Sequence, residues 1–207
     1  MKIEGSCHCG KVRFSCEAYA PVPFLHCYCS ICRKTAGGSG SAINLGARAD
    51  TLEIEGREHL GVYRARIAEE DSGCRVSSGQ RHFCSGCGSA LWLFDPEWPE
   101  LVHPHASAID TPLPEAPERV HMLLDSKANW VRVPEGPGDV HVDGFPEESL
   151  EDWHRRCGGR PARIRRAVCD GDPLHCELAH RGGVGHAVLR SGCGADAGRT
   201  RLASSRP

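Results

Sequence analysis

The sequence lacks several features that would place it in common classes of protein. No stretch approaches the roughly 20 consecutive apolar residues of a membrane span, and residues 1–10 hold no apolar run typical of a secretory signal. Neither sign of charge dominates, because 25 Lys and Arg stand against 27 Asp and Glu; this excludes a globally basic nucleic-acid binder. Aromatic residues make up only 6% of the 207 residues, yet 40% of the chain is hydrophobic, which is enough for a core. We therefore expect a globular cytoplasmic protein without a membrane partner.

The composition changes near residue 155. Residues 1–155 carry 15 basic and 23 acidic residues, whereas residues 156–207 carry ten Arg and only four acidic residues. The second segment also has nine Gly and no Phe, Tyr or Trp, so it lacks the usual means of building a core. We predict a globular domain over 1–155 and a poorly ordered Arg/Gly-rich tail over 156–207.

Short alternating runs indicate that the domain is all-β. In residues 11–17, Val12, Phe14 and Cys16 alternate with polar residues, as in a strand with one buried face. The same reasoning predicts further short strands at residues 52–55, 62–65, 82–84, 90–94, 120–124 and 140–142.

Two other segments are expected to interrupt the strands. Residues 110–118 contain three prolines and are predicted to form a loop. Residues 147–155 are the one clearly helical segment, because Pro146 would lie near the first turn and acidic residues follow it.

Thirteen cysteines are the most informative part of the composition. An odd number without a secretory signal argues against a disulfide scaffold, and closely spaced thiols in a reducing compartment favour metal or redox chemistry. Seven of the cysteines form three clusters, which are Cys7-His8-Cys9, Cys27-Tyr28-Cys29-Ser30-Ile31-Cys32 and Cys84-Ser85-Gly86-Cys87.

The spacing of these clusters favours zinc. A CxxC pair followed by Gly88 is typical of a zinc-knuckle turn, in which glycine permits the tight turn and two sulfurs converge on one ion. The first and third clusters could together complete a four-sulfur tetrahedron. The middle cluster would then supply three thiolates without an obvious fourth ligand, and catalytic zinc sites keep one position open in this way.

With their flanking residues 5–14, 27–38 and 81–89, the clusters resemble the signature blocks of the glutathione-dependent formaldehyde-activating enzyme (GFA) family, also called the centromere protein V domain family. The resemblance covers about residues 5 to 153 and implies a zinc-stapled β-tent (Mss4-like) fold. It implies two zinc ions per chain. The structural ion would be bound by Cys7, Cys9, Cys84 and Cys87, and the catalytic ion, where the substrate thiol binds, by Cys27, Cys29 and Cys32. Tyr28 departs from the histidine common in the family, and the tail matches nothing in it.

The three-thiolate site suggests a reaction. Zinc with three thiolates is a poor Lewis acid for water but suits holding an added thiol as a nucleophile. That thiolate could add to a small aldehyde, and the reverse reaction is that of a carbon–sulfur lyase. The resemblance implies glutathione and formaldehyde as the substrates. Arg33 and Lys34 follow the third ligand and are candidates for binding an anionic thiol, or are simply solvated surface residues.

Other residues leave alternatives open. His26 could close the second zinc site, although neighbours on a strand point apart, which favours a place beside the site. Cys16 is expected to be an inert buried thiol, and Cys74 to lie in a turn where it could be reactive. His103 and His105 are expected in a surface loop that could border a pocket.

A non-catalytic zinc module is the alternative function, associated with nucleic acid through the basic tail. The tail has no aromatic residues for base stacking and the domain is acidic, so nucleic acid is not the expected partner. The tail's four cysteines show no paired spacing that would indicate a third metal site. The sequence does not indicate an oligomeric state.

Overall fold

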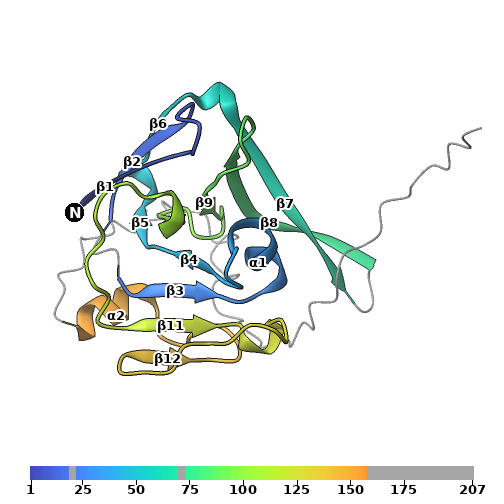
Figure 1. The fold of residues 1–207 in the computed structure, drawn as a ribbon, viewed down its shortest axis with the longest axis vertical. Helices are drawn as coiled ribbons and strands as arrows, with labels where there is room; N and C mark the ends of the chain where they lie inside the picture. Colours follow the sequence, from blue (N-terminus) through green and yellow to red (C-terminus); the bar gives the residue numbers. More distant parts are fainter. Residues whose placement is uncertain (19–21, 70–72, 158–207) are drawn as a thin grey trace, which may run out of the picture.

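A computed structural model describes residues 1–18, 22–69 and 73–157. This part of the chain is mostly β, with twelve strands and two short α-helices. The strands form three sheets, which stand on three sides of the molecule in Figure 1. The predictions for residues 158–207 lie outside the described residues.

The first sheet has the order β1-β2-β6 and is antiparallel. It consists of β1 (Lys2–Ser6), β2 (Arg13–Glu17) and β6 (Glu53–Glu55). The turn between β1 and β2 carries the first cysteine cluster.

The second sheet has the order β5-β10-β9-β8-β7 and is also antiparallel. Its strands are β5 (Ala47–Arg48), β10 (Leu101–Pro104), β9 (Ala90–Phe94), β8 (Gly73–Cys84) and β7 (Leu60–Glu69). The turn after β8 carries the third cysteine cluster, so two of the clusters lie at the ends of strands from different sheets.

The third sheet has the order β12-β11-β3-β4. Its strands are β12 (Asp139–His141), β11 (Arg119–Met122), β3 (Phe24–Cys27) and β4 (Ala42–Asn44). β11 is parallel to both of its neighbours, whereas β3 and β4 are antiparallel. The parallel register places His26, His121 and His141 side by side.

The main core lies between the first two sheets. Ile3, Val12 and Leu91 are fully buried there, and Phe14 packs edge-on against Trp92 at a centroid distance of 5.1 Å. A second, smaller core cluster surrounds the middle cysteine cluster, with Ala42 and Met122.

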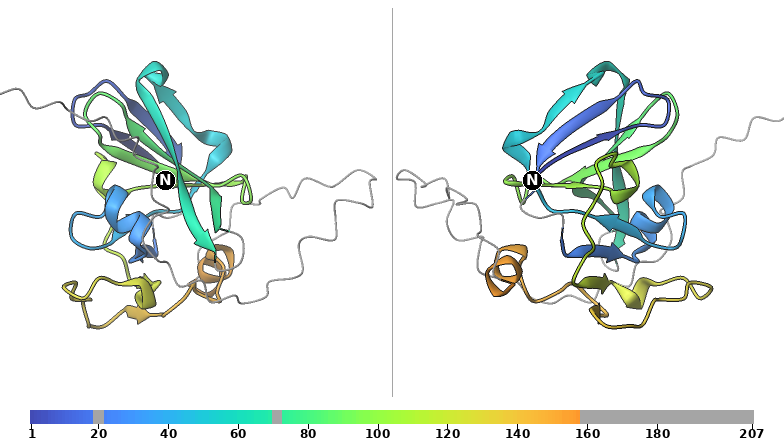
Figure 2. Two further views of the ribbon diagram at one scale, coloured as in Figure 1. Left: turned by 90° about the vertical axis from the view of Figure 1, so that its right-hand side faces the viewer. Right: turned by 60° about the vertical axis from the view of Figure 1, so that its left-hand side comes forward.

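The two helices differ from the sequence-based expectation. α1 (Ser30–Ala36) was not predicted, because its residues were interpreted only as a cysteine motif; the Sγ of Cys29 caps it by accepting a hydrogen bond from the Cys32 N–H. α2 (Leu150–Arg156) begins later than predicted, because the Ser149 hydroxyl accepts from the Asp152 N–H at 3.1 Å and caps the helix there. Pro146 therefore precedes the helix. α2 lies beside the start of β11 (Figure 2).

The predicted strands are present, with shifted ends. Residues 90–94 match β9, and the alternation at Val12, Phe14 and Cys16 is confirmed, since all three are buried. Residues 62–65 and 82–84 are parts of the longer hairpin strands β7 and β8. The segment 120–124 leaves the sheet after Met122 and turns into a 3₁₀ helix. Sequence alternation did not indicate β1, β3, β4, β5 or β10.

In the described part of the chain, no helix is long and apolar enough to cross a membrane.

Candidate functional site

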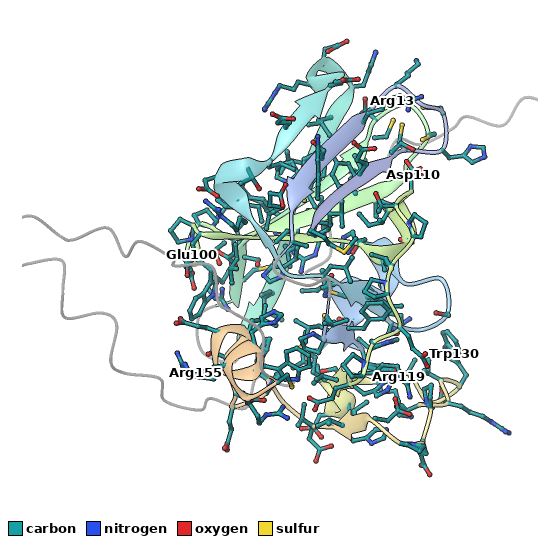
Figure 3. All side chains as sticks on the ribbon, turned by 90° about the vertical axis from the view of Figure 1, so that its left-hand side faces the viewer. Arg13, Glu100, Asp110, Arg119, Trp130 and Arg155 are labelled. Carbon is teal, nitrogen blue, oxygen red and sulfur yellow. The ribbon has the colours of Figure 1, made fainter. Side chains whose placement is uncertain are left out.

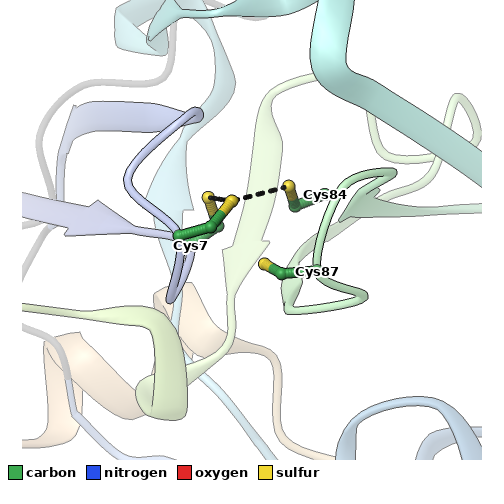
Figure 4. Close-up of side chains that lie close together, drawn as sticks. Cys7, Cys84 and Cys87 are labelled. Carbon is green, nitrogen blue, oxygen red and sulfur yellow. Dashed lines mark hydrogen bonds between the residues drawn. The ribbon is translucent and has the colours of Figure 1, made fainter.

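The first and third cysteine clusters meet in space. We call Cys7, Cys9, Cys84 and Cys87 the four-cysteine set; their sulfur atoms all lie within 4.8 Å of one another (Figure 4). The Sγ of Cys9 is 3.5 Å from that of Cys7 and 3.7 Å from that of Cys84. A zinc ion with bonds of about 2.3 Å to four sulfurs has edges of about 3.8 Å between them. The donor set therefore fits a tetrahedral zinc ion.

Two glycine turns aim these sulfurs at one point. Gly10 follows Cys9 and Gly88 follows Cys87, and both have positive φ, 73° and 76°. Each turn is closed by a backbone hydrogen bond, from Gly10 to the Cys7 carbonyl at 2.9 Å and from Gly88 to the Cys84 carbonyl at 2.8 Å. The left-handed conformation is one that glycine adopts without strain.

Ser89 joins the two turns, a role that the sequence did not indicate. Its hydroxyl lies 3.2 Å from the Cys87 sulfur and accepts the His8 N–H at 3.1 Å. The Ser89 hydroxyl and backbone lower the pKa of Cys87 to about 5, which favours the thiolate form that a metal needs. His8 itself is exposed, as expected from its place between two ligands.

The middle cluster forms the three-cysteine set, Cys27, Cys29 and Cys32. Cys27 ends β3, Cys29 caps α1 and Cys32 lies in its first turn, and their sulfurs are within 4.8 Å of one another. All three are at most 5% exposed. Among the described residues, no further His, Cys, Asp or Glu belongs to this group. The set can hold a metal ion by three sulfurs.

The pKa values of the three thiols are shifted in different directions. Hydrogen bonds from the thiols of Cys27 and Cys32 hold the pKa of Cys29 well below its usual range, and backbone N–H groups of α1 act in the same direction. The pKa of Cys27 is raised by the same contacts and by burial. The backbone N–H groups and the neighbouring thiols thus favour the thiolate form of Cys29.

His26 does not join the three-cysteine set. Its ring packs against His121 with a centroid distance of 4.7 Å, and burial lowers its pKa to about 4, so it is neutral at pH 7. Since neighbours on a strand point to opposite faces, His26 and Cys27 lie on opposite faces of the third sheet. The expectation that His26 lies beside the site agrees with this position.

A buried polar chain supports the three-cysteine set from this other face. The Tyr28 hydroxyl is 2.9 Å from Nδ1 of His121, and Nε2 of His121 is 3.0 Å from Oδ1 of Asp139. Arg119, labelled in Figure 3, donates to the same carboxylate oxygen at 2.6 Å. Arg119 and His121 together hold the pKa of Asp139 well below its usual range. Of these hydrogen-bonded residues the sequence pointed only to Tyr28, because the others come from β11 and β12, which are distant from it in the sequence.

A cavity of about 340 Å³ lies between α1 and the sheet of β8 and β9. That volume falls within the range of small-molecule pockets, about 300–1,000 Å³. Thr35 lines it one helical turn beyond Cys32, and the positive charge of Arg81, another lining residue, acts on the Cys32 thiol, whereas none of the three cysteines is itself among the described lining residues. Its lining residues are Thr35, Tyr63, Arg81, His82, Phe83, Gly88, Ala90 and His105.

The predicted substrate residues do not line this cavity. Arg33 is half-buried, with an Nε that has no hydrogen-bond partner among the described residues, and Lys34 is exposed. Arg81 was not singled out from the sequence, because nothing in its local pattern distinguishes it from other arginines on strands.

Three lesser expectations can be compared with the structure. Cys16 is buried, and burial raises its pKa to about 12, so it is an inert thiol as predicted. Cys74 lies in β8 opposite Ala68 rather than in a turn. His103 lies in β10, and His105 follows it into the core, where it is 3% exposed and hydrogen-bonded to Asn44 at 3.0 Å, so the expectation of a surface loop was wrong. The alternative that the segment borders a pocket is confirmed for His105, which lines the cavity.

Similarities to known proteins were found at the level of a family profile, of a curated relative and of a solved structure. The family profile described as "Glutathione-dependent formaldehyde-activating enzyme" matches residues 2–125, which include all seven clustered cysteines. A curated relative from Halomonas elongata, named "Putative glutathione-dependent formaldehyde-activating enzyme", is 56% identical over 158 residues, covering 76% of this chain and 98% of the relative. A crystal structure of a Rhodobacter sphaeroides protein is 26% identical, with a TM-score of 0.41, and covers 54% of this chain and 91% of that chain. From the first two similarities, the chain belongs to the glutathione-dependent formaldehyde-activating enzyme family.

Proposed function

We propose that the chain binds two zinc ions and catalyses the reversible addition of a thiol to a small aldehyde. In this proposal the four-cysteine set is structural and staples a β-tent fold, and Cys27, Cys29 and Cys32 form the catalytic site. The observation that carries the proposal is the three-cysteine set beside a cavity, with three sulfur ligands where tetrahedral zinc takes four.

Zinc bound to three thiolates would supply an open position at which an added thiol loses its proton. The chain's own residues prepare this position. The Cys32 N–H donates to the Cys29 sulfur at 3.3 Å and stabilises its charge. The burial of all three cysteines keeps bulk water away from the sulfur atoms.

The reaction forms one bond between carbon and sulfur. The thiol sulfur attacks the carbonyl carbon, the carbonyl π bond opens, and the oxygen takes up the proton that the thiol gave up. The product from formaldehyde is an S-hydroxymethyl adduct, which is a hemithioacetal, and the reverse reaction makes the protein a carbon–sulfur lyase. The names of the family and of the Halomonas elongata relative support glutathione and formaldehyde as the substrates.

The same proposal suggests where the protein works. The seven clustered cysteines are free thiols in the structure. Thiols of this kind stay reduced in a compartment such as the cytoplasm. Small thiol and aldehyde molecules are then the expected partners, and the tail is not required for the chemistry.

Metal analysis and a thiol titration test the proposal. We expect two zinc ions per chain in the purified protein and one in a Cys29→Ala variant. In the cobalt-substituted protein, glutathione should change the visible spectrum from three-sulfur toward four-sulfur character and release protons. Cys16→Ser serves as the control, because Cys16 belongs to neither set. A single ion per chain that remains in Cys29→Ala, or a spectrum that ignores thiols, would contradict the proposal.

A further inference from the structure

We infer that the cavity between α1 and β8 selects thiols that carry a carboxylate, and that Arg81 binds this carboxylate. The inference rests on the proposed function, because the thiol end of the same molecule has to reach the three-cysteine set. It adds the residue that recognises the carboxylate of the thiol and the cavity in which it does so.

Among the described residues, Arg81 is the only formally charged one in the lining of the cavity. The two lining histidines are neutral at pH 7, because burial lowers the pKa of His82 and lowers the pKa of His105 to about 4. No Asp or Glu in the part of the chain that the structure describes lines the cavity. The cavity thus has a positive charge within a domain whose acidic residues outnumber its basic ones.

The donors of Arg81 are mostly unused. Within the described residues, its guanidinium makes one hydrogen bond, from Nη1 to the Gly79 carbonyl at the long distance of 3.4 Å, and no ion pair. A guanidinium has five N–H donors in a planar fork that matches a carboxylate. A half-buried arginine in this state can therefore bind an incoming carboxylate by two parallel hydrogen bonds.

The position of Arg81 relates the cavity to the sulfur ligands. Its positive charge acts on His105 within the cavity lining and on the thiol of Cys32. Thr35 of the same lining lies one turn from Cys32 on α1. One small molecule could therefore place a carboxylate at Arg81 and a sulfur atom at the three-cysteine set.

The volume of the cavity also argues for a thiol with a polar extension. About 340 Å³ is far more than formaldehyde or a bare thiol group needs, and it lies at the lower end of the range for small-molecule sites. Arg33 and Lys34 are outside this lining, so a carboxylate bound to either of them would lie outside the cavity. The occupant that matches both the volume and the charge is a small anionic thiol.

Three thiols of similar size separate the effect of charge from the effect of sulfur. They are 3-mercaptopropionate, which is anionic, 2-mercaptoethanol, which is neutral, and cysteamine, which is cationic. Each is titrated into the full-length cobalt-substituted protein, and binding is read from the visible spectrum rather than from activity. We expect 3-mercaptopropionate to bind about tenfold or more tightly than 2-mercaptoethanol, as one charge-assisted hydrogen-bonded pair predicts. Cysteamine should bind most weakly.

Arg81→Gln removes the charge and should abolish this preference while the protein still binds 2-mercaptoethanol. Arg81→Lys keeps the charge but loses the planar fork, so part of the preference should remain. Arg64→Gln on neighbouring β7 is the matched control, since Arg64 is exposed and outside the cavity lining, and it should keep the full preference. If Arg81→Gln does not fold, Arg81→Lys and a salt series on the wild-type protein still test the inference. A preference for the anionic thiol that depends on charge falls as the ionic strength rises.

The outcomes distinguish a failure of the role of Arg81 from a failure of the proposed function. If the wild-type protein binds all three thiols with equal affinity at every salt concentration, the inference about Arg81 is overturned, while the proposed thiol site stands. If the preference survives Arg81→Gln but disappears in Arg33→Gln or Lys34→Gln, the carboxylate lies at α1 and the inference is also overturned. If no thiol changes the wild-type spectrum, the proposed function itself fails.

Discussion

The Sγ atoms of Cys9 and Cys84 lie 3.7 Å apart, although 75 positions separate the two residues in the sequence. Their contact joins the turn after β1 to the last residue of β8, and so joins two sheets. The three-cysteine set, in contrast, lies within residues 27–32 and joins only β3 to α1. A metal ion in the first set would cross-link distant parts of the fold, whereas one in the second would leave the rest of the fold unchanged.

Cys84→Ala should therefore unfold the domain, while Cys29→Ala should leave it folded but unable to bind thiols. Structural zinc contributes about 10–16 kcal/mol in small zinc domains, which is as large as the total stability of about 5–15 kcal/mol. Circular dichroism and thermal unfolding of both variants measure the difference. Cys16→Ala is the control for loss of a buried thiol without loss of a ligand. Equal melting temperatures for Cys84→Ala and Cys29→Ala would show that the division of roles is wrong.

Gly88→Ala should destabilise the protein and weaken metal binding. A Cβ at Gly88 meets nothing within 4 Å, so the cost comes only from its φ of 76°, in the left-handed region. This conformation costs an L-residue about 1–2 kcal/mol. Gly38→Ala is a matched control, because its Cβ also meets nothing within 4 Å and its φ is not in the left-handed region. Similar unfolding midpoints for the two variants would contradict the importance of the Gly88 turn.

Replacing His105 should weaken the pH dependence of stability between pH 7 and pH 5. Burial lowers the pKa of His105 to about 4 in the folded protein, below the ordinary value of 6.5. The unfolded chain thus binds more protons in this range, and stability falls as the pH falls from about 6.5 toward 4. His105→Gln should reduce the loss of unfolding free energy between pH 7 and pH 5 by about 2 kcal/mol.

Urea unfolding of both proteins at several pH values checks this prediction. Glutamine keeps an N–H donor for Asn44, so the variant retains a replacement for the native hydrogen bond. His59→Gln is the control, since the His59 side chain is 37% exposed. Parallel pH curves for wild type and His105→Gln would rule out His105 as a source of the pH dependence.

Truncation after residue 157 should leave melting temperature and thiol binding unchanged, whereas truncation after residue 149 should destabilise the domain. The longer fragment keeps α2, in which Trp153 is 4% exposed and its indole N–H donates to Glu118 at 2.7 Å. It also keeps Arg156, which pairs with Glu148 at 2.8 Å and would be lost by a cut at the predicted boundary after residue 155. Loss of a buried Trp costs about 3–5 kcal/mol.

Thermal unfolding of the two fragments and of full-length Trp153→Ala tests this. Trp153→Ala should resemble the shorter fragment, because both lose the same buried side chain. Insoluble protein from the fragment 1–157 would contradict the prediction that the tail is dispensable.

Local patterns in the sequence were sufficient for several features of this protein. Alternation at Val12, Phe14 and Cys16 identified a buried strand face, because side chains on a strand alternate with a period of two residues. Cysteine spacing identified the members of both sets, since short CxC and CxxC spacings let neighbouring sulfurs bind the same ion. α1 was missed because its cap is a cysteine sulfur, which the usual helix signals do not include.

The remaining features depend on which strands become neighbours. The polar chain behind the three-cysteine set needs β3, β11 and β12 in parallel register, which brings Tyr28, His121 and Asp139 into one buried line. The cavity needs Arg81 from β8, Thr35 from α1 and His105 after β10. Contacts of this kind join residues that are far apart in the chain, and burial of the shared core decides them. Short-range spacing therefore identifies the cysteines that could hold a metal ion, while the residues that would recognise a substrate were assembled only by the packing of separate strands.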